Sequence, residues 1–218
     1  MTLGEIKVET LRIMNLNMEN ELKSDAASIK KYTENNNYRS YLLNINGAIN
    51  RCFSDLETKG VMPTKSILLD KSRGETRSRL TRFTKEQISS DLFELVKITY
   101  ENSDGDYEGD VEYLREGDSI LVEMEDSGEH TKHFYTAIYR PKISRITGEI
   151  SDDTELSIPE NIVCHIPYFL KGELYRQDEP GEAGEARNWY ESAMEVIIKS
   201  EKEKSNSLKG VVSLYAQG

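Results

Sequence analysis

The residues best suited to metal chemistry lie in the acidic segment DGDYEGD, residues 104–110. Asp104, Asp106 and Glu108 follow the alternating spacing of the first ligands in a helix–loop–helix calcium site. The position that requires a bidentate glutamate is occupied by Arg115, and the flanking segments have the composition of strands. The segment is therefore predicted to be a solvated hairpin turn that binds no calcium.

The histidines and cysteines offer little further chemistry. His130 and His133 lie three residues apart in HTKH, but no third metal ligand is evident. Cys164 and His165 are adjacent in a helix-like segment, so their side chains point to different faces and a Cys–His nucleophile is not expected. Cys52 and Cys164 are predicted to be buried, reduced thiols. Because phosphate-binding glycine loops and nucleophile-elbow motifs are also missing from the sequence, we predict no cofactor, no metal and no enzymatic activity.

Positive charge is concentrated in residues 65–85, KSILLDKSRGETRSRLTRFTK. This segment carries a net charge of +5 in a chain of net charge −11, which leaves −16 for the remainder. Two interpretations stay open: a contact patch for an acidic partner or for DNA, and a solvated loop. Opposite charges segregated on one chain would also suit a ring in which neighbouring subunits attract. The candidate contact residues are Lys71, Arg73, Arg77, Arg79 and Arg82.

Helices are predicted in residues 1–62. Thr2 and Glu5 form a capping box, which indicates a helix start. The segment NYRSYLLNINGAINRCFSDLETKG has apolar residues at three- and four-residue spacing and is the strongest predicted helix of the chain. Gly60 and Pro63 are typical stop signals after it.

Residues 63–150 are predicted to form an inserted β domain. Runs such as SILLD, DLFELVKITY, SILVEM and KHFYTAIYRP are rich in β-branched and aromatic residues. Polar, glycine-containing segments separate them. We expect an antiparallel sheet or small sandwich of about four to six strands.

Residues 151–200 are predicted to form a helical hairpin with an acidic corner. Pro159 suits a first helical position, Pro167 should kink the first arm, and Pro180 should open the second arm. The fold class is therefore predicted as α+β: an antiparallel helical bundle from the N- and C-terminal segments, with an inserted antiparallel β domain and an extended C-terminal arm. That arm, residues 201–218, combines a polar linker with an apolar, β-prone end.

The hairpin segment IPENIVCHIPYFLKGELYRQDEPGEAGEARNWYESAMEVI resembles the C-terminal signature of tailed-phage head-to-tail connector (adaptor) proteins. In that family a proline precedes a helix that leads to hxxYhxxxLYxxDEPxxAxxARxxYExA, where h is apolar. The opening segment MTLGEIKVETLRIM and the helix before Pro63 are similar to the same family. The residues that carry the hairpin resemblance are Pro159, Ile166, Tyr168, Leu170, Leu174, Tyr175, Asp178, Glu179, Pro180, Ala183, Ala186, Arg187, Tyr190, Glu191 and Ala193.

The resemblance implies a structural virion protein that forms a dodecameric ring between the portal protein and the tail tube or nozzle protein. Such a ring extends the DNA channel without binding DNA specifically, is assembled in the host bacterial cytoplasm and ends in the virion neck. The acidic composition suits such a conduit, because negative walls repel phosphate. No membrane association is expected, since no run of eighteen apolar residues exists.

The resemblance also assigns two groups of contact residues. The portal-binding arm would use Leu208, Val211, Val212, Leu214 and Tyr215. The hairpin and subunit interface would use Tyr168, Tyr175, Asp178, Glu179, Arg187, Trp189 and Tyr190. Arg187 is expected to pair with Asp178 or Glu179, or to cross to a neighbouring subunit.

Two other functions remain open from the sequence. One is a regulatory protein that binds nucleic acid through residues 65–85, although the net charge of −11 argues against bulk DNA binding. The other is a different neck component, such as a stopper or a tail-completion protein.

Overall fold

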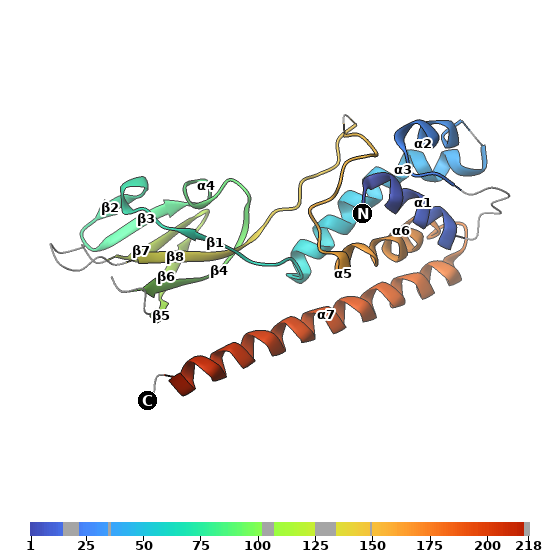
Figure 1. Ribbon diagram of the computed structural model, residues 1–218. Coiled ribbons are helices and arrows are strands. Elements are labelled where there is room, and N and C mark those ends of the chain that lie inside the picture. The colour runs from blue at the N-terminus through green and yellow to red at the C-terminus, as the bar shows by residue number, and fades with distance from the viewer. Residues whose placement is uncertain (15–21, 35, 102–106, 125–133, 149, 216–218) are drawn as a thin grey trace. The chain divides into compact units, whose positions relative to one another are not determined.

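The computed structural model describes residues 1–218 except 15–21, 35, 102–106, 125–133, 149 and 216–218 (Figure 1). The chain divides into two compact units. The helical unit combines residues 1–61 with residues 143–218, and the β unit spans Met62–Lys142. The predicted α+β class is confirmed, because long helices and antiparallel sheets occur in separate parts of the chain.

The helical unit is built from both ends of the chain. Thr2 and Glu5 form the predicted capping box before the first helix: the Glu5 amide donates to Thr2 Oγ1 at 3.1 Å, and the Thr2 amide donates to Glu5 Oε2 at 2.7 Å. Its described helices are α1 (Leu3–Ile13), α2 (Ala26–Tyr32), α3 (Asn36–Lys59), α5 (Glu160–Val163), α6 (Ile166–Leu174) and α7 (Pro180–Tyr215).

Helix α3 supplies the central apolar stripe of this unit. Its members are fully buried because they recur at three- and four-residue spacing and therefore share one face. The helix ends before Gly60, whose φ of +65° is the left-handed conformation that favours glycine after a helix. The buried stripe contains Ile45, Ile49, Cys52, Phe53 and Leu56.

The first arm of the hairpin differs from the prediction. Pro167 does not kink a continuous helix. It lies in the first turn of α6, after α5 has ended at Val163 with Cys164 as its C-terminal cap. A proline is well accommodated there, because first-turn amides have no intrahelical acceptor to lose. The second arm, α7, begins at Pro180 as predicted.

The C-terminal segment also differs from the predicted extended arm. Helix α7 has 36 residues and continues to Tyr215, so its backbone is about 54 Å long (Figure 1). Residues 201–207 are rich in Glu, Lys and Ser, and adding such residues to an existing helix costs little because nucleation has already occurred. The side chains of residues 202–218 lie outside the described part of the structure.

The β unit contains two four-stranded antiparallel sheets, with orders β1-β8-β4-β5 and β2-β3-β7-β6. More strands are described than the predicted four to six. The main reason is that the basic segment, for which a solvated loop was one of the two interpretations, forms short strands. The strands are β1 (Lys65–Leu68), β2 (Glu75–Arg77), β3 (Leu80–Thr84), β4 (Leu92–Glu101), β5 (Tyr107–Val111), β6 (Tyr113–Glu116), β7 (Ser119–Glu123) and β8 (Phe134–Pro141). A 3₁₀ turn, η1 (Lys71–Arg73), and the short helix α4 (Lys85–Ile88) complete the unit.

A polar cluster fixes one end of the first sheet of this unit. Lys65 Nζ lies 2.6 Å from Asp91 Oδ2, and the Ser89 and Tyr139 hydroxyls donate to Asp91 Oδ1 at 2.5 and 2.9 Å. The Lys65 hydrogen bond, followed by that of Ser89, lowers the pKa of Asp91 to about 2. This carboxylate therefore joins residues from β1 and β8 to the segment that precedes β4.

Candidate functional site

The predicted hairpin residues lie along α6, the corner and the first turns of α7. Tyr175 and Tyr190 are buried in the helical unit, Arg187 is half-buried, and Trp189 is exposed. The hairpin therefore has one side that packs inside the unit and one side that faces solvent.

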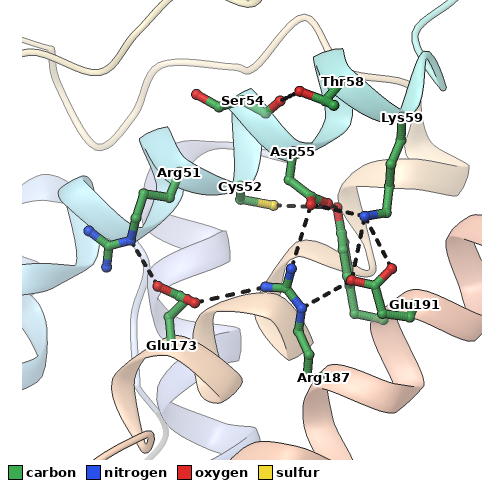
Figure 2. A network of polar contacts seen from close by, with 10 residues as sticks. Arg51, Cys52, Ser54, Asp55, Thr58, Lys59, Glu173, Arg187 and Glu191 are labelled. Atoms are coloured by element: carbon green, nitrogen blue, oxygen red, sulfur yellow. Dashed lines mark hydrogen bonds and ion pairs between the residues drawn. The ribbon is translucent and has the colours of Figure 1, made fainter.

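Arg187 is the centre of the packed side (Figure 2). Its guanidinium lies 3.1 Å from Glu191, 3.5 Å from Asp55 and 3.8 Å from Glu173. It also lies over the ring of Phe169, 4.2 Å from the centroid, in a cation–π arrangement. The predicted pairing with Asp178 or Glu179 is wrong, because the Arg187 side chain extends toward α3 and not toward the corner.

The ion pairs around Arg187 extend into a network that joins three helices. Arg51 of α3 pairs with Glu173 of α6 at 2.8 Å (Figure 2). Lys59 of α3 lies 2.9 Å from Asp55 and 3.1 Å from Glu191 of α7. The sequence analysis missed the α3 members, although Arg51, Asp55 and Lys59 recur every four residues beside the apolar stripe, a spacing that marks one helix face.

Tyr190 and Cys52 lie beneath this network and are not reactive groups. The fully buried Tyr190 donates its hydroxyl to Asp55 Oδ2 at 2.7 Å, and Cys52 Sγ lies 4.0 Å from the same hydroxyl. Burial raises the pKa of both groups, which favours the neutral thiol and phenol. Cys52 is buried as predicted, whereas Cys164 is exposed, because it caps the short helix α5 on its solvent side.

Negative charge collects at the α6–α7 corner. Asp178 and Glu179 are both exposed there. Burial, followed by the charges of Asp178 and Glu179, raises the pKa of Tyr41, whose ring packs edge-on against Tyr175 at 5.8 Å. The corner therefore exposes two carboxylates to solvent, with the exposed Arg176 close to them in the sequence.

The solvent side of the hairpin carries exposed apolar side chains. Trp189 is 70% exposed and Val196 is 69% exposed, and their seven-residue separation places them on one face of α7. The indole of Trp189 stacks on Tyr168 of α6, with ring centroids 6.3 Å apart and planes 25° apart. Large exposed apolar side chains that cluster on one surface are typical of protein interfaces.

The candidate basic residues lie on the β unit and differ in their polar partners. Arg77 and Arg79 are exposed beside the turn between β2 and β3, and no ion pair with a described residue neutralises them. Arg82 of β3 lies 3.5 Å from Glu116, and Lys71 donates to the Met124 carbonyl at 3.1 Å. Arg73 is exposed in η1.

Several predicted residues lie outside the described part of the structure. Asp104, Asp106, His130 and His133 are among them, so their arrangement is not described. The predicted arm residues belong to the α7 backbone, but their side chains are not described: Leu208, Val211, Val212, Leu214 and Tyr215.

Searches of the described residues for two further features gave negative results. No group of three or more His, Cys, Asp or Glu side chains is arranged to hold a metal ion. None of the described helices combines the length and the apolar composition that crossing a membrane requires.

A scan of the chain against known protein families finds no matching family, and a search of curated proteins finds no matching relative.

Proposed function

We propose that this chain is a structural virion protein, the head-to-tail adaptor that joins the portal to the tail and extends the DNA channel. The observation that carries the proposal is the two-sided α6–α7 hairpin. Its inner side is fixed by the Arg187 network, while its outer side exposes Trp189 and Val196. A rigid scaffold that presents aromatic and aliphatic side chains to solvent suits assembly better than catalysis.

The resemblance of the hairpin sequence to the adaptor family supports the same proposal. On this proposal the chain forms a ring, dodecameric by resemblance, and its partners are the portal protein, a tail tube or nozzle protein, and further copies of itself. The net charge of −11 suits a channel wall, because DNA phosphates are repelled and slide past it. The protein acts without a cofactor, in the neck of the virion.

The C-terminal part of α7 is proposed as the portal-binding segment. Residues 208, 211, 212 and 215 are Leu, Val, Val and Tyr, and in the α7 helix their spacing assigns them to one face. An amphipathic helix of this kind binds in an apolar groove of a partner. This replaces the extended arm that the sequence alone predicted.

The test is binding to the portal protein encoded by the same phage genome. The full chain should co-sediment with the portal. Removal of residues 205–218 should abolish that binding while the remaining chain still unfolds cooperatively, as followed by circular dichroism. A matched control keeps the length but replaces Ser205 and Ser207 by alanine, and it should bind as the wild type does. Equal portal binding by the truncated and full chains would contradict the proposed role of the segment.

A nucleic-acid-binding regulator is the second candidate, and the exposed Arg77 and Arg79 are the observation in its favour. Salt-dependent binding of duplex DNA by the monomer, lost on reversal of these two charges, would support it over the adaptor.

A further inference from the structure

The hairpin carries a small apolar surface in which Trp189 and Val196 are exposed and Tyr168 and Ala193 are half-buried. We call it the Trp189 patch and define it as Tyr168, Trp189, Ala193 and Val196. Trp189, Ala193 and Val196 follow each other at four- and three-residue spacing on α7, and Tyr168 adds a stacked ring from α6. In water such a surface is unfavourable, so its occurrence in a chain with 31% charged residues indicates a partner.

Negative charge borders the Trp189 patch on the N-terminal side of α7. Glu185 and Glu182 precede Trp189 by four and seven residues, so both lie on the same helix face. Glu182 pairs with Lys171 at 2.8 Å, but its carboxylate remains half-exposed. Glu185 is exposed and has no ion-pair partner among the described residues. A complementary partner surface would therefore combine an apolar side chain with cations.

The β2–β3 hairpin of the β unit has this combination. Leu80 is 38% exposed and lies directly opposite Arg77 in the strand pairing. Arg79 precedes Leu80, and Arg82 lies on the same solvent face of β3, since Thr81 and Phe83 alternate inward. Leu80 is thus an exposed apolar side chain with Arg77 opposite it on β2, Arg79 beside it in the turn, and Glu123 opposite it on β7.

The turn of this hairpin is also conformationally unusual. Arg77 pairs with Leu80, so Ser78 and Arg79 form a two-residue turn. Ser78 has a φ of +59°, where glycine is normally preferred. Strained, non-glycine turns occur more often at positions that make functional contacts.

We propose that the β2–β3 hairpin of one copy of this chain docks on the Trp189 patch of a second copy. Leu80 would lie against the indole, and Arg77 and Arg79 would face Glu185 and Glu182. Arginine suits this position because it pairs with carboxylates and stacks on aromatic rings. The inference deepens the proposed function, since it names the contact by which one subunit would hold the next.

The proposed contact joins two different surfaces, so a bound pair still has one hairpin and one patch free. Contacts of this heterologous kind close into rings or continue as filaments. They therefore allow growth beyond a dimer, whereas a reciprocal two-fold contact between the same surfaces would stop at two copies.

The experiment uses three variants of the full chain. The first carries Arg77→Glu with Arg79→Glu, the second carries Glu182→Lys with Glu185→Lys, and the third combines all four changes. Lys85→Glu, at the start of α4, and Glu195→Lys, on α7, serve as controls, because both reverse exposed charges outside the proposed contact. Circular dichroism establishes that each variant is folded, and native mass spectrometry measures assembly with and without the portal protein.

The wild type and both controls should form oligomers larger than dimers. Each two-site variant alone should stay monomeric or require at least about tenfold more protein to assemble, a factor that corresponds to about 1.4 kcal/mol. An equimolar mixture of the two variants should assemble again as alternating copies, because the hairpin of each variant carries a charge opposite to that of the other variant's patch. The four-site variant should assemble again, since its opposite charges have exchanged places.

Three results would overturn the contact. If both two-site variants assemble at wild-type concentrations, the proposed contact is excluded. The adaptor proposal is unaffected by that result as long as both variants still bind the portal. A wild type that stays monomeric with and without bound portal would also exclude it. Loss of duplex-DNA binding on Arg77→Glu with Arg79→Glu, with assembly unchanged, would assign the hairpin to nucleic acid instead.

Discussion

Replacement of Arg187 by alanine tests whether the ion-pair network holds the hairpin to α3. The change removes three ion pairs, to Asp55, Glu173 and Glu191, and the cation–π contact with Phe169. The Arg187 side chain is 35% exposed, so each pair is partly screened by water and contributes about 0.2–1 kcal/mol. The cation–π contact adds about 0.5–2 kcal/mol.

The remaining cations limit the loss. Arg51 still pairs with Glu173, and Lys59 still pairs with Asp55 and Glu191. Each of the three carboxylates therefore keeps a cation as its partner. The loss of stability stays below the roughly 3–5 kcal/mol expected when a buried charge loses its only partner. We expect Arg187→Ala to lower the free energy of unfolding by about 2–3 kcal/mol, because these coupled terms do not add fully.

Urea unfolding followed by far-UV circular dichroism measures this loss, since the long helices belong to the helical unit. Arg187→Lys should cost about 1 kcal/mol, because it keeps the charge but loses the planar fork. Asn188→Ala, at the exposed neighbouring position, should change stability by less than about 0.5 kcal/mol. If Arg187→Ala falls within the same small range as Asn188→Ala, the network does not stabilise the hairpin and the reasoning is refuted.

Three further predictions concern single side chains. Tyr190→Phe removes a buried hydroxyl that donates to a carboxylate of α3, and should lower the free energy of unfolding by about 1–2 kcal/mol in the same urea assay; an unchanged midpoint would contradict this. The pKa of Asp91 in the folded chain, about 2, lies below its ordinary value of 3.8, so the ionised carboxylate stabilises the β unit above pH 3.8 and this contribution is lost as the pH falls toward 2. Asp91→Asn or Lys65→Met should therefore remove part of the acid dependence of thermal unfolding, and an unaltered dependence would show that the cluster has no such role. Cys164 should react with a thiol reagent in the native chain, whereas Cys52 should react only after unfolding, and equal rates for the two thiols would disagree with their burial.

Local signals predicted much of the secondary structure. The Thr2–Glu5 capping box, the apolar stripe of α3 and the start of α7 at Pro180 depend on residues only a few positions apart. The strands β4 and β8 were predicted because long runs of β-branched and aromatic residues leave few other conformations. These elements agree with the sequence because their own residues determine them.

Features that depend on distant residues were not predicted. Asp55, one of the three ion-pair partners of Arg187, comes from α3, more than a hundred residues earlier, so no local pattern could favour it over the nearby Asp178. The short strand β2 exists because β3 pairs with it, and three residues of its own give a weak signal. Pro167 fits a kink inside one helix as well as the first turn of a new helix, and composition alone did not distinguish the two; the structure has the second arrangement, in α6.

The measurement that tests the proposed adaptor function most directly is native mass spectrometry of the full chain, alone and mixed with a portal protein encoded in the same genome. The account predicts a ring of fixed stoichiometry that binds the portal. This binding should be lost when residues 205–218 are removed. A chain that remains monomeric, binds no portal and instead binds duplex DNA in a salt-dependent manner would contradict the adaptor function.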